Sequence, residues 1–375
     1  MNVRKTFVRV DWPVFLLVLA LCGAGLLNVY SGTRVFPSSG IPLFYKQMIW
    51  ILLGVTVFFL FCYLSGGFIE EMAWYVFLAV VAVLLVVLLV GKVRGGAQRW
   101  LSLGIFTFQP SEFAKIALIL ALASYFSRRY SYEGIGFRDL APAVGITLIP
   151  FLLVALQPDL GTAGVFLIIL FAMTVIACVR AKVFFLVGAA GAVAVPGLWF
   201  LMKNYQKQRV LTFLDPGRDP LGAGYHVIQS KIAVGSGGLL GKGYLQGTQG
   251  SLRFLPEQHT DFAFAVLSEE WGFAGSVVLL LLFLALVYRM YYLASQSQDR
   301  FASFACGGLA SYFLAHIVIN VAMVCGLFPV VGIPLPFVSY GGSSMLTNMM
   351  ALGILASLSR TRFTFQTGEE KSLSA

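Results

Sequence analysis

Long apolar runs separated by short polar segments dominate the chain. A helix rises 1.5 Å per residue, so about 20 mostly apolar residues are needed to cross the roughly 30 Å hydrocarbon core of a bilayer. Ten runs approach or reach that length, and each predicts a transmembrane helix, because a helix pairs its own backbone groups away from water. The ten predicted spans cover residues 13–30, 47–64, 73–91, 109–127, 140–156, 160–179, 183–202, 262–290, 302–327 and 337–358.

One long segment, residues 203–261, interrupts this pattern between the seventh and eighth predicted spans. Residues 225–234 within it have the pattern of a short amphipathic helix, and the glycine-rich stretch that follows, 236–243, predicts irregular chain. The other connections are short, and residues 361–375 form a polar tail. The predicted fold is a single all-α polytopic membrane domain over residues 1–375, with one long loop.

The composition agrees with a membrane protein. Hydrophobic residues make up 59% of the 375 positions and charged residues only 11%, against roughly 25% charged in typical soluble domains. The net charge of +10 comes from scattered basic residues, so no nucleic-acid partner is expected. The five cysteines lie in or beside apolar runs without a CxxC pair, which argues against a disulfide framework and a thiolate zinc site.

The distribution of Lys and Arg predicts the orientation. Most basic residues of the short loops lie on the side that holds both termini, which the positive-inside rule assigns to the cytoplasm. The segments around 95–100, 157–162, 203–261 and 339–344 then face the other side of the membrane. We therefore expect the polar chemistry of the protein on its extracytoplasmic face.

Two charged residues, Glu112 and Lys115, fall inside the fourth predicted span. They are three positions apart and share one helix face, so an internal ion pair that only orients the helix is one interpretation. Because charges inside a membrane are expensive, they also suggest function. In that second interpretation, Lys115 binds an anionic group of a substrate.

A third acidic residue, Asp159, lies between the fifth and sixth predicted spans. Asp commonly caps a helix by accepting a backbone N–H, and the span that follows offers such a position. Alternatively, a carboxylate at the mouth of a helix bundle holds a divalent cation or positions a sugar hydroxyl.

The run LPEQHTDF, which ends the long segment, contains Glu257, His259 and Asp261. Asp261 lies where the loop meets the membrane, and burial there raises the pKa of a carboxyl group toward the range of a general base. A capping role for the eighth span is the alternative. The nearby acidic residues Glu269 and Glu270 make the local acidic cluster larger than capping requires.

Several common site motifs are missing from the sequence. The Gly241-Lys242 pair lacks the flanking residues of a phosphate-binding P-loop, so no nucleotide cofactor is expected. The three histidines are widely spaced, no HExxH motif occurs, and His316 fits a hydrogen-bonded packing residue better than a metal ligand.

Six motifs in order along the chain resemble the SEDS family (shape, elongation, division and sporulation). They are QPSEFAK, QPDLGT, RVLTFLDP, GYHVIQSKIAVGSGGLLGKG, FLPEQHTDFAFAVLSEEWG and PLPFVSYGGSS, and the resemblance covers about residues 11–360. The FLPEQHTDF and GTQGSLRF runs are more similar to the proteins of cell elongation and rod shape than to those of division.

This resemblance implies a peptidoglycan glycosyltransferase that polymerises lipid II in the bacterial cytoplasmic membrane. It also implies that Asp261 is catalytic, and that Glu112, Lys115, Asp159 and Arg99 matter for function. A divalent cation, Mg²⁺ or Mn²⁺, is implied as a cofactor, although its ligands are unknown. The implied partners are lipid II, a class B penicillin-binding protein, other membrane proteins of the elongation complex and the surrounding lipid.

The predicted residues suit that chemistry. Asp261 would accept the proton of the acceptor 4-hydroxyl as it attacks the donor anomeric carbon, an inverting step that needs no second carboxylate. Lys115, Arg99, Arg209 or a bound cation would stabilise the departing diphosphate, and Glu257 and His259 are further substrate-binding candidates. A lipid flippase and a scaffold for a partner enzyme are the alternatives, since intramembrane charges also occur in transporters.

Overall fold

The computed structural model describes residues 11–33, 41–94, 97–102, 107–130, 135–179, 200, 204–218, 222–252, 254–255 and 257–360. Within these ranges, nine of the predicted spans coincide with helices. These are α2 (Trp12–Thr33), α3 (Leu43–Cys62), α4 (Gly66–Val90), α5 (Pro110–Arg129), α6 (Phe137–Leu156), α7 (Leu160–Ile176), α12 (Ala263–Ser295), α13 (Arg300–Val324) and α14 (Gly342–Leu358). Most of the seventh predicted span, 183–202, and the tail 361–375 lie outside the described residues.

Six of these helices, α2, α3, α4, α6, α12 and α13, are long and apolar enough to cross a membrane. The apolar helices α7 and α14 are shorter, with 17 residues each, and α5 carries four charged residues. The described part of the chain therefore confirms a multi-pass helical membrane protein. The total of ten spans stays a prediction.

The prediction of an all-α fold was wrong for one short stretch. Between α4 and α5 the chain forms β1 (Lys92–Arg94), β2 (Ala97–Ser102) and β3 (Thr107–Phe108), which pair antiparallel in that order. Strands of two to six residues are too short to show the alternating pattern by which strands are predicted.

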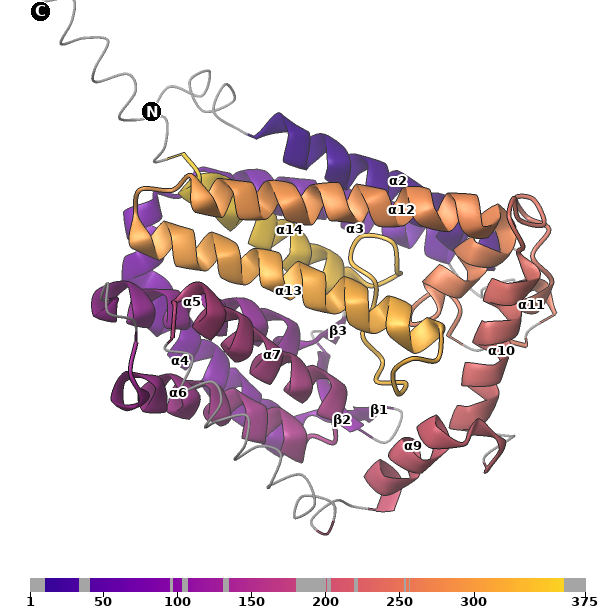
Figure 1. The fold of residues 1–375 in the computed structure, drawn as a ribbon, viewed down its shortest axis with the longest axis horizontal. Coiled ribbons are helices and arrows are strands. Elements are labelled where there is room, and N and C mark those ends of the chain that lie inside the picture. The colour runs from indigo at the N-terminus through magenta and orange to yellow at the C-terminus, as the bar shows by residue number, and fades with distance from the viewer. Residues whose placement is uncertain are drawn as a thin grey trace, which may run out of the picture.

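The segment 203–261, predicted as a loop with one short helix, is mostly helical where it is described. It contains α9 (Asn204–Leu214), the 3₁₀ helix η1 (Pro216–Arg218), α10 (Ala223–Ser236) and α11 (Thr248–Ser251). Helix α10 confirms the helix predicted over 225–234, and the chain after it is irregular as its glycines predict. These elements lie together at one end of the bundle, on the right in Figure 1, beside the start of α12.

Two helix starts differ from the predicted ones for local reasons. Helix α4 begins at Gly66 rather than 73, because the Ser65 hydroxyl caps it by accepting the Phe68 N–H at 3.3 Å. Helix α14 begins at Gly342 rather than 337, because Pro334 and Pro336 disfavour helix in the chain before it, which turns at 336–338 with a φ of 65° at Phe337.

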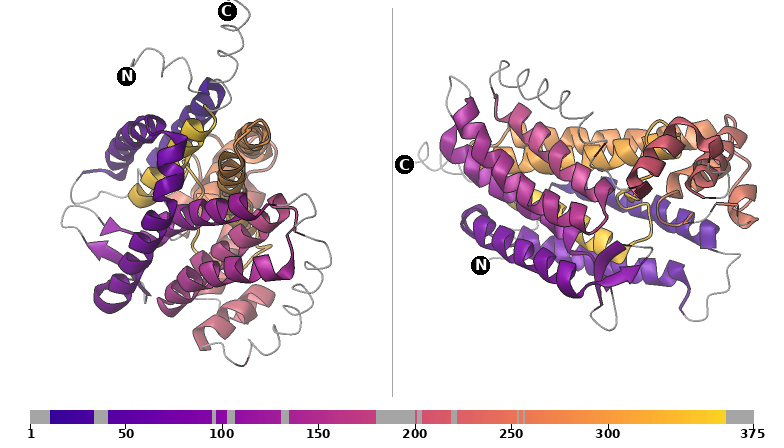
Figure 2. Two further views of the ribbon diagram at one scale, coloured as in Figure 1. Left: turned by 90° about the vertical axis from the view of Figure 1, so that its left-hand side faces the viewer. Right: turned by 90° about the horizontal axis from the view of Figure 1, so that it is seen from below.

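Helix α5 lies at the centre of the bundle. It packs against α4, α7 and α13, while α3 packs against α14 and α12 packs against α2 and α13; the views in Figure 2 show this arrangement from two further sides. Almost every residue of α5 from Pro110 to Phe126 is buried. Glu112 and Lys115 are therefore held in the protein interior, not against lipid.

Candidate functional site

Asp261 lies just before α12, at the junction between the α9–α11 segment and the bundle. The residue at the N-cap of α12 is Phe262, and no side chain caps this helix, so the capping interpretation of Asp261 was wrong. Asp261 is half-buried. Its carboxylate lies against Gly332, where an added Cβ would come within 3.3 Å of Oδ2.

Three consecutive carbonyl groups position this aspartate. The Tyr340 N–H donates to the carbonyl of His259 at 2.8 Å, and the Ser339 hydroxyl donates to that of Thr260 at 2.6 Å. The Asn320 side-chain amide on α13 donates to the carbonyl of Asp261 at 3.0 Å. The backbone around Asp261 is thus fixed from two other segments, while its carboxylate receives no hydrogen bond from the residues described.

The surroundings of Asp261 favour its protonated form. Burial is the main cause that raises the pKa of Asp261 to about 6; the negative charges of Glu257 and Asp159 act in the same direction, and the positive charges of Arg99 and Arg209 oppose them. Burial also lowers the pKa of His259, so its imidazole is uncharged at neutral pH. Asp261 is therefore ionised at pH 7 but has a carboxylate more basic than an exposed one.

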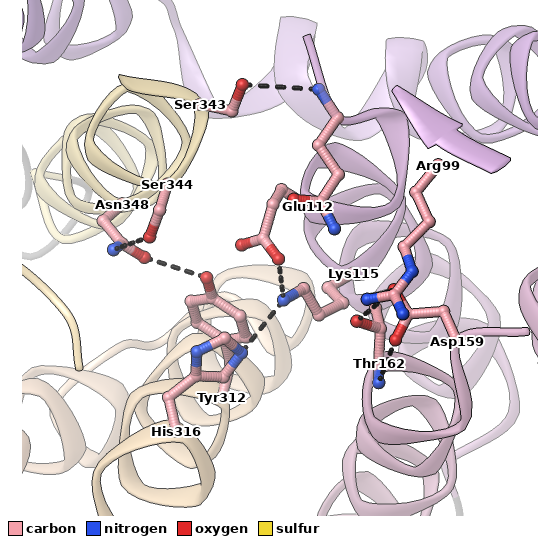
Figure 3. A network of polar contacts seen from close by, with 11 residues as sticks. Arg99, Glu112, Lys115, Asp159, Thr162, Tyr312, His316, Ser343, Ser344 and Asn348 are labelled. Atoms are coloured by element: carbon pink, nitrogen blue, oxygen red, sulfur yellow. Dashed lines mark hydrogen bonds and ion pairs between the residues drawn. The ribbon is translucent and has the colours of Figure 1, made fainter. Parts of the chain in front are cut away.

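Asp159 forms a second polar centre with Arg99. Its Oδ1 accepts the Thr162 N–H at 3.3 Å and its Oδ2 accepts the Thr162 hydroxyl at 3.0 Å, so the predicted capping role, here of α7, is confirmed. Oδ2 also lies 3.4 Å from Nη1 of Arg99, which projects from β2. Strand β2, which was not predicted, thus places the guanidinium of Arg99 next to the start of α7 (Figure 3).

Lys115 lies in a buried network between α5, α13 and α14, shown in Figure 3. Its Nζ is 2.7 Å from Oε1 of Glu112 and 3.0 Å from Nε2 of His316, and it lies over the ring of Tyr312. The Tyr312 hydroxyl donates to Oδ1 of Asn348 at 2.8 Å. The ion pair predicted from the three-residue spacing is therefore present, and Lys115 is only 1% exposed.

The acidic residues Glu269 and Glu270 do not join Asp261 in one cluster. Oε1 of Glu269 accepts hydrogen bonds from the Lys242 ammonium at 2.6 Å and the Thr248 N–H at 2.8 Å. Glu270 accepts a hydrogen bond from the Ser31 hydroxyl on α2. These hydrogen bonds link the 242–249 chain and α2 to α12, so the acidic residues that are dense in the sequence do not gather around Asp261 in the structure.

Arg209 is the most accessible of the basic residues singled out from the sequence. It is exposed on α9 and lines a recess with Thr212, Phe213, Val227 and Val330. Its positive charge lowers the pKa of Asp261, against the larger effect of burial. Glu257 is also exposed, and its carboxylate accepts a hydrogen bond from the Thr260 hydroxyl at 3.1 Å.

The side chains that the structure describes do not form a ligand set for the predicted divalent cation. Among the described residues, no three His, Cys, Asp or Glu side chains lie close enough together to hold a metal ion. Asp159 already uses its two oxygens for Thr162 and Arg99. The divalent cation stays a prediction.

Asn320 and Ser339 were not identified as site residues from the sequence. Asn320 also donates to the carbonyl of Ile333 at 2.8 Å, so one amide joins α13 to two separate segments. A polar amide in the middle of an apolar run is a usable signal, because an amide in a membrane span needs a hydrogen-bond partner. No pattern in the sequence indicates that the partner is the carbonyl of Asp261.

The chain is similar to known proteins over most of its length. A model of the FtsW/RodA/SpoVE cell cycle protein family matches residues 12–363. The peptidoglycan glycosyltransferase MrdB of Escherichia coli (strain K12) is 41% identical over 370 residues, which cover 95% of each chain. The peptidoglycan glycosyltransferase RodA of Treponema pallidum (strain Nichols) is 35% identical over 421 residues, covering 93% of this chain and 97% of the relative. A solved structure of a peptidoglycan synthase complex contains a chain with a TM-score of 0.81 and 35% identity, covering 94% of this chain and 98% of that one.

Proposed function

Because this chain belongs to the FtsW/RodA/SpoVE family of cell cycle proteins and is a peptidoglycan glycosyltransferase, we propose that it polymerises lipid II with Asp261 as the general base. The observation that carries the proposal is the state of Asp261. Its backbone is held by Asn320, its carboxylate receives no hydrogen bond from the part of the chain that the structure describes, and its pKa is raised to about 6. A free carboxylate with a raised pKa is suited to accept a proton.

The proposed step is a single inverting displacement. The acceptor 4-hydroxyl attacks the anomeric carbon of the donor, and its proton passes to the Asp261 carboxylate as the new glycosidic bond forms. The bond between the anomeric carbon and the diphosphate oxygen breaks, and its electron pair leaves with undecaprenyl diphosphate. One carboxylate suffices because no covalent glycosyl-enzyme intermediate is formed.

Of the three basic residues predicted to bind substrate, Arg99, Lys115 and Arg209, the last is best placed to receive the diphosphate of the donor. It is exposed, lines a recess and influences Asp261 electrostatically. Arg99 is committed to Asp159, and Lys115 is buried with Glu112 and His316. Lys115 could bind substrate only if its contacts with Glu112 and His316 were broken, so we assign Lys115 a structural role.

We place the Asp261 end of the bundle on the extracytoplasmic side of the cytoplasmic membrane, with both termini in the cytoplasm. The distribution of basic residues supports this orientation. A class B penicillin-binding protein is the proposed partner, and similarity to a chain of a peptidoglycan synthase complex supports an assembly of that kind.

The test is strand formation from purified lipid II. The protein is reconstituted with a class B penicillin-binding protein whose transpeptidase serine is blocked, and products are separated by length. Glycan strands are the expected result. Movement of lipid II across vesicle membranes without strand formation would instead support the flippase alternative.

The rate of strand formation should depend on pH through Asp261. The base must be ionised, so activity is expected to fall as the pH drops through about 6, whereas an ordinary Asp would titrate near pH 4. Glu257→Gln removes a negative charge that raises the pKa of Asp261. The acidic limb of the pH–rate profile, where the rate falls with falling pH, should therefore move to lower pH. Asp139→Asn, an exposed carboxylate of α6, is the matched control and should leave the limb unchanged. An identical limb in wild type and Glu257→Gln would contradict the assignment.

Asn320 should act as a positioning residue for Asp261. Asn320→Ala removes the hydrogen bonds to the carbonyls of Asp261 and Ile333, and a misplaced base typically costs up to about 10²-fold in rate. We expect kcat to fall by about 10- to 100-fold with little change in KM. Asn348→Ala, which removes another buried amide without touching the 259–261 segment, is the control for lost stability. Equal losses of kcat in the two variants would show that only stability is affected.

A further inference from the structure

Helix α12 is interrupted at Gly272, whose φ of 64° and ψ of −162° are not helical. Residues 237–243, called here the 237–243 loop, fill the break. The N–H groups of Phe273 and Ala274 donate to the carbonyls of Gly238 and Leu239 at 2.9 and 3.0 Å. In return, the N–H groups of Lys242 and Gly243 donate to the carbonyls of Glu269 and Glu270, each at 3.0 Å. The polar backbone groups that the break exposes are thus paired by the loop.

The outer surface of the 237–243 loop is apolar. Leu239 is 75% exposed and Leu240 is 83% exposed, and Phe273 of α12, 65% exposed, lies next to them in the hydrogen-bonded pairing. The single charge of the loop, on Lys242, is paired with the buried carboxylate of Glu269 at 2.6 Å. A segment with paired backbone groups, a neutralised charge and exposed leucines meets the requirements for contact with lipid.

Contacts between α2 and α12 give the depth of the loop in the membrane. The two helices lie side by side (Figure 1), joined at one end by the Asp11–Arg289 ion pair at 2.7 Å and at the other by the Ser31–Glu270 hydrogen bond. Asp11 and Ser31 are 20 positions apart and Glu270 and Arg289 are 19 apart, or about 30 Å at 1.5 Å per residue.

That distance equals the thickness of a hydrocarbon core, about 30 Å. Taking the two contacts as the edges of the hydrocarbon core places the loop just inside the edge at the Asp261 end, because the loop pairs with Phe273 and Ala274, which follow Glu270 toward the membrane centre.

We propose that the 237–243 loop is a membrane anchor whose Leu239 and Leu240 side chains insert among the acyl chains of the leaflet at the Asp261 end. The apolar outer surface of the 237–243 loop continues along α12 through three exposed side chains, those of Val278, Leu281 and Leu284. Their spacing is that of a lipid-facing stripe. Helices that pack in membranes approach through small residues, whereas this surface presents large ones. Lipid is therefore favoured over a transmembrane helix of a partner.

The anchor would hold α10 at the membrane. Helix α10 (Ala223–Ser236) runs directly into the loop, and the close approach of Gly237 to the carbonyl of Ser268 leaves no room for a side chain. The loop and the first turns of α12 therefore move together, and insertion of the two leucines fixes the height of the 259–261 segment relative to the lipid surface.

The test measures the depth of a nitroxide at position 240. Leu240→Cys is labelled in a background with Cys178 and Cys325 replaced by Ser, because these two native cysteines are not buried. The protein is placed in vesicles of phosphatidylethanolamine and phosphatidylglycerol, and collisions with oxygen, which concentrates in hydrocarbon, are compared with collisions with a water-soluble nickel chelate. Leu281→Cys on the lipid-facing stripe and Gln296→Cys after α12 are the matched controls.

We expect position 240 to behave like position 281, with oxygen collisions exceeding nickel collisions several-fold, and unlike position 296. Dominant nickel collisions at 240 would overturn the proposal by placing the loop in water. Low collisions with both reagents would also overturn it, because the loop would then be covered by another copy of the chain. Loss of oxygen collisions on addition of the penicillin-binding protein would assign the surface to that partner instead. Leu239→Cys repeats the measurement if Leu240→Cys does not fold.

Discussion

Asp261→Asn is expected to lower the rate of strand formation by about 10²- to 10⁴-fold, the usual contribution of a general base. The amide has nearly the shape of the carboxylate but cannot accept the proton of the acceptor hydroxyl. The hydrogen bond that holds this residue goes from Asn320 to its backbone carbonyl, so the substitution leaves the local backbone in place. Strand length and rate are measured with the blocked penicillin-binding protein present.

The same variant should be at least as stable as wild type at neutral pH. The pKa of Asp261 is about 6 in the folded protein against 3.8 ordinarily, so ionisation above pH 6 costs the folded state up to about 3 kcal/mol. Asn removes this cost. The difference in thermal stability should shrink as the pH falls from about 6 and vanish below about 3.8, where the carboxyl group is protonated in both states. A melting temperature several degrees lower for Asp261→Asn at pH 7 would indicate a structural role.

Lys115→Met is expected to have the largest effect on stability, about 3–5 kcal/mol. Removing one partner of a buried ion pair leaves the other charge uncompensated, and Glu112 is only 3% exposed. Oε2 of Glu112 has no hydrogen-bond partner in the described structure, so Oε1 depends on Lys115. Thermal unfolding in detergent measures the effect, and the melting temperature should fall by roughly 5–15 °C.

Two further variants show whether the pair itself is responsible. Glu112→Gln combined with Lys115→Met removes both charges and should recover most of the lost stability. Arg129→Met breaks the exposed Arg129–Asp139 pair and should cost about 1 kcal/mol or less. A double variant as unstable as Lys115→Met would contradict the explanation. A stable double variant that forms no strands would restore the substrate-binding interpretation of Lys115.

The membrane helices could be predicted because their pattern is local. A run of about 20 apolar residues has few alternatives, and α2, α3 and α6 lie close to their predicted positions. The Glu112–Lys115 pair was predictable for the same reason, since three-residue spacing in one helix determines proximity. The break of α12 at Gly272 was not predicted, because its cause is the 237–243 loop that packs into it.

The arrangement around Asp261 depends on contacts between distant segments. Asn320, Ser339 and Tyr340 bind three neighbouring carbonyls, although 59 to 81 positions separate the paired residues. Sequence spacing carries no information about such pairs. Glu269 and Glu270 illustrate the opposite error, because their nearness to Asp261 in sequence suggested a common site while their hydrogen bonds serve the 242–249 chain and α2.

The most direct test of Asp261 as the general base measures lipid II binding and single-turnover strand formation on one preparation of Asp261→Asn. A group that acts only on the transferred proton contributes to the rate and little to ground-state binding. We predict a dissociation constant for lipid II within about threefold of wild type, together with a loss of at least about 100-fold in the single-turnover rate. Strand formation at the wild-type rate, or a loss of binding equal to the loss of rate, would contradict this role.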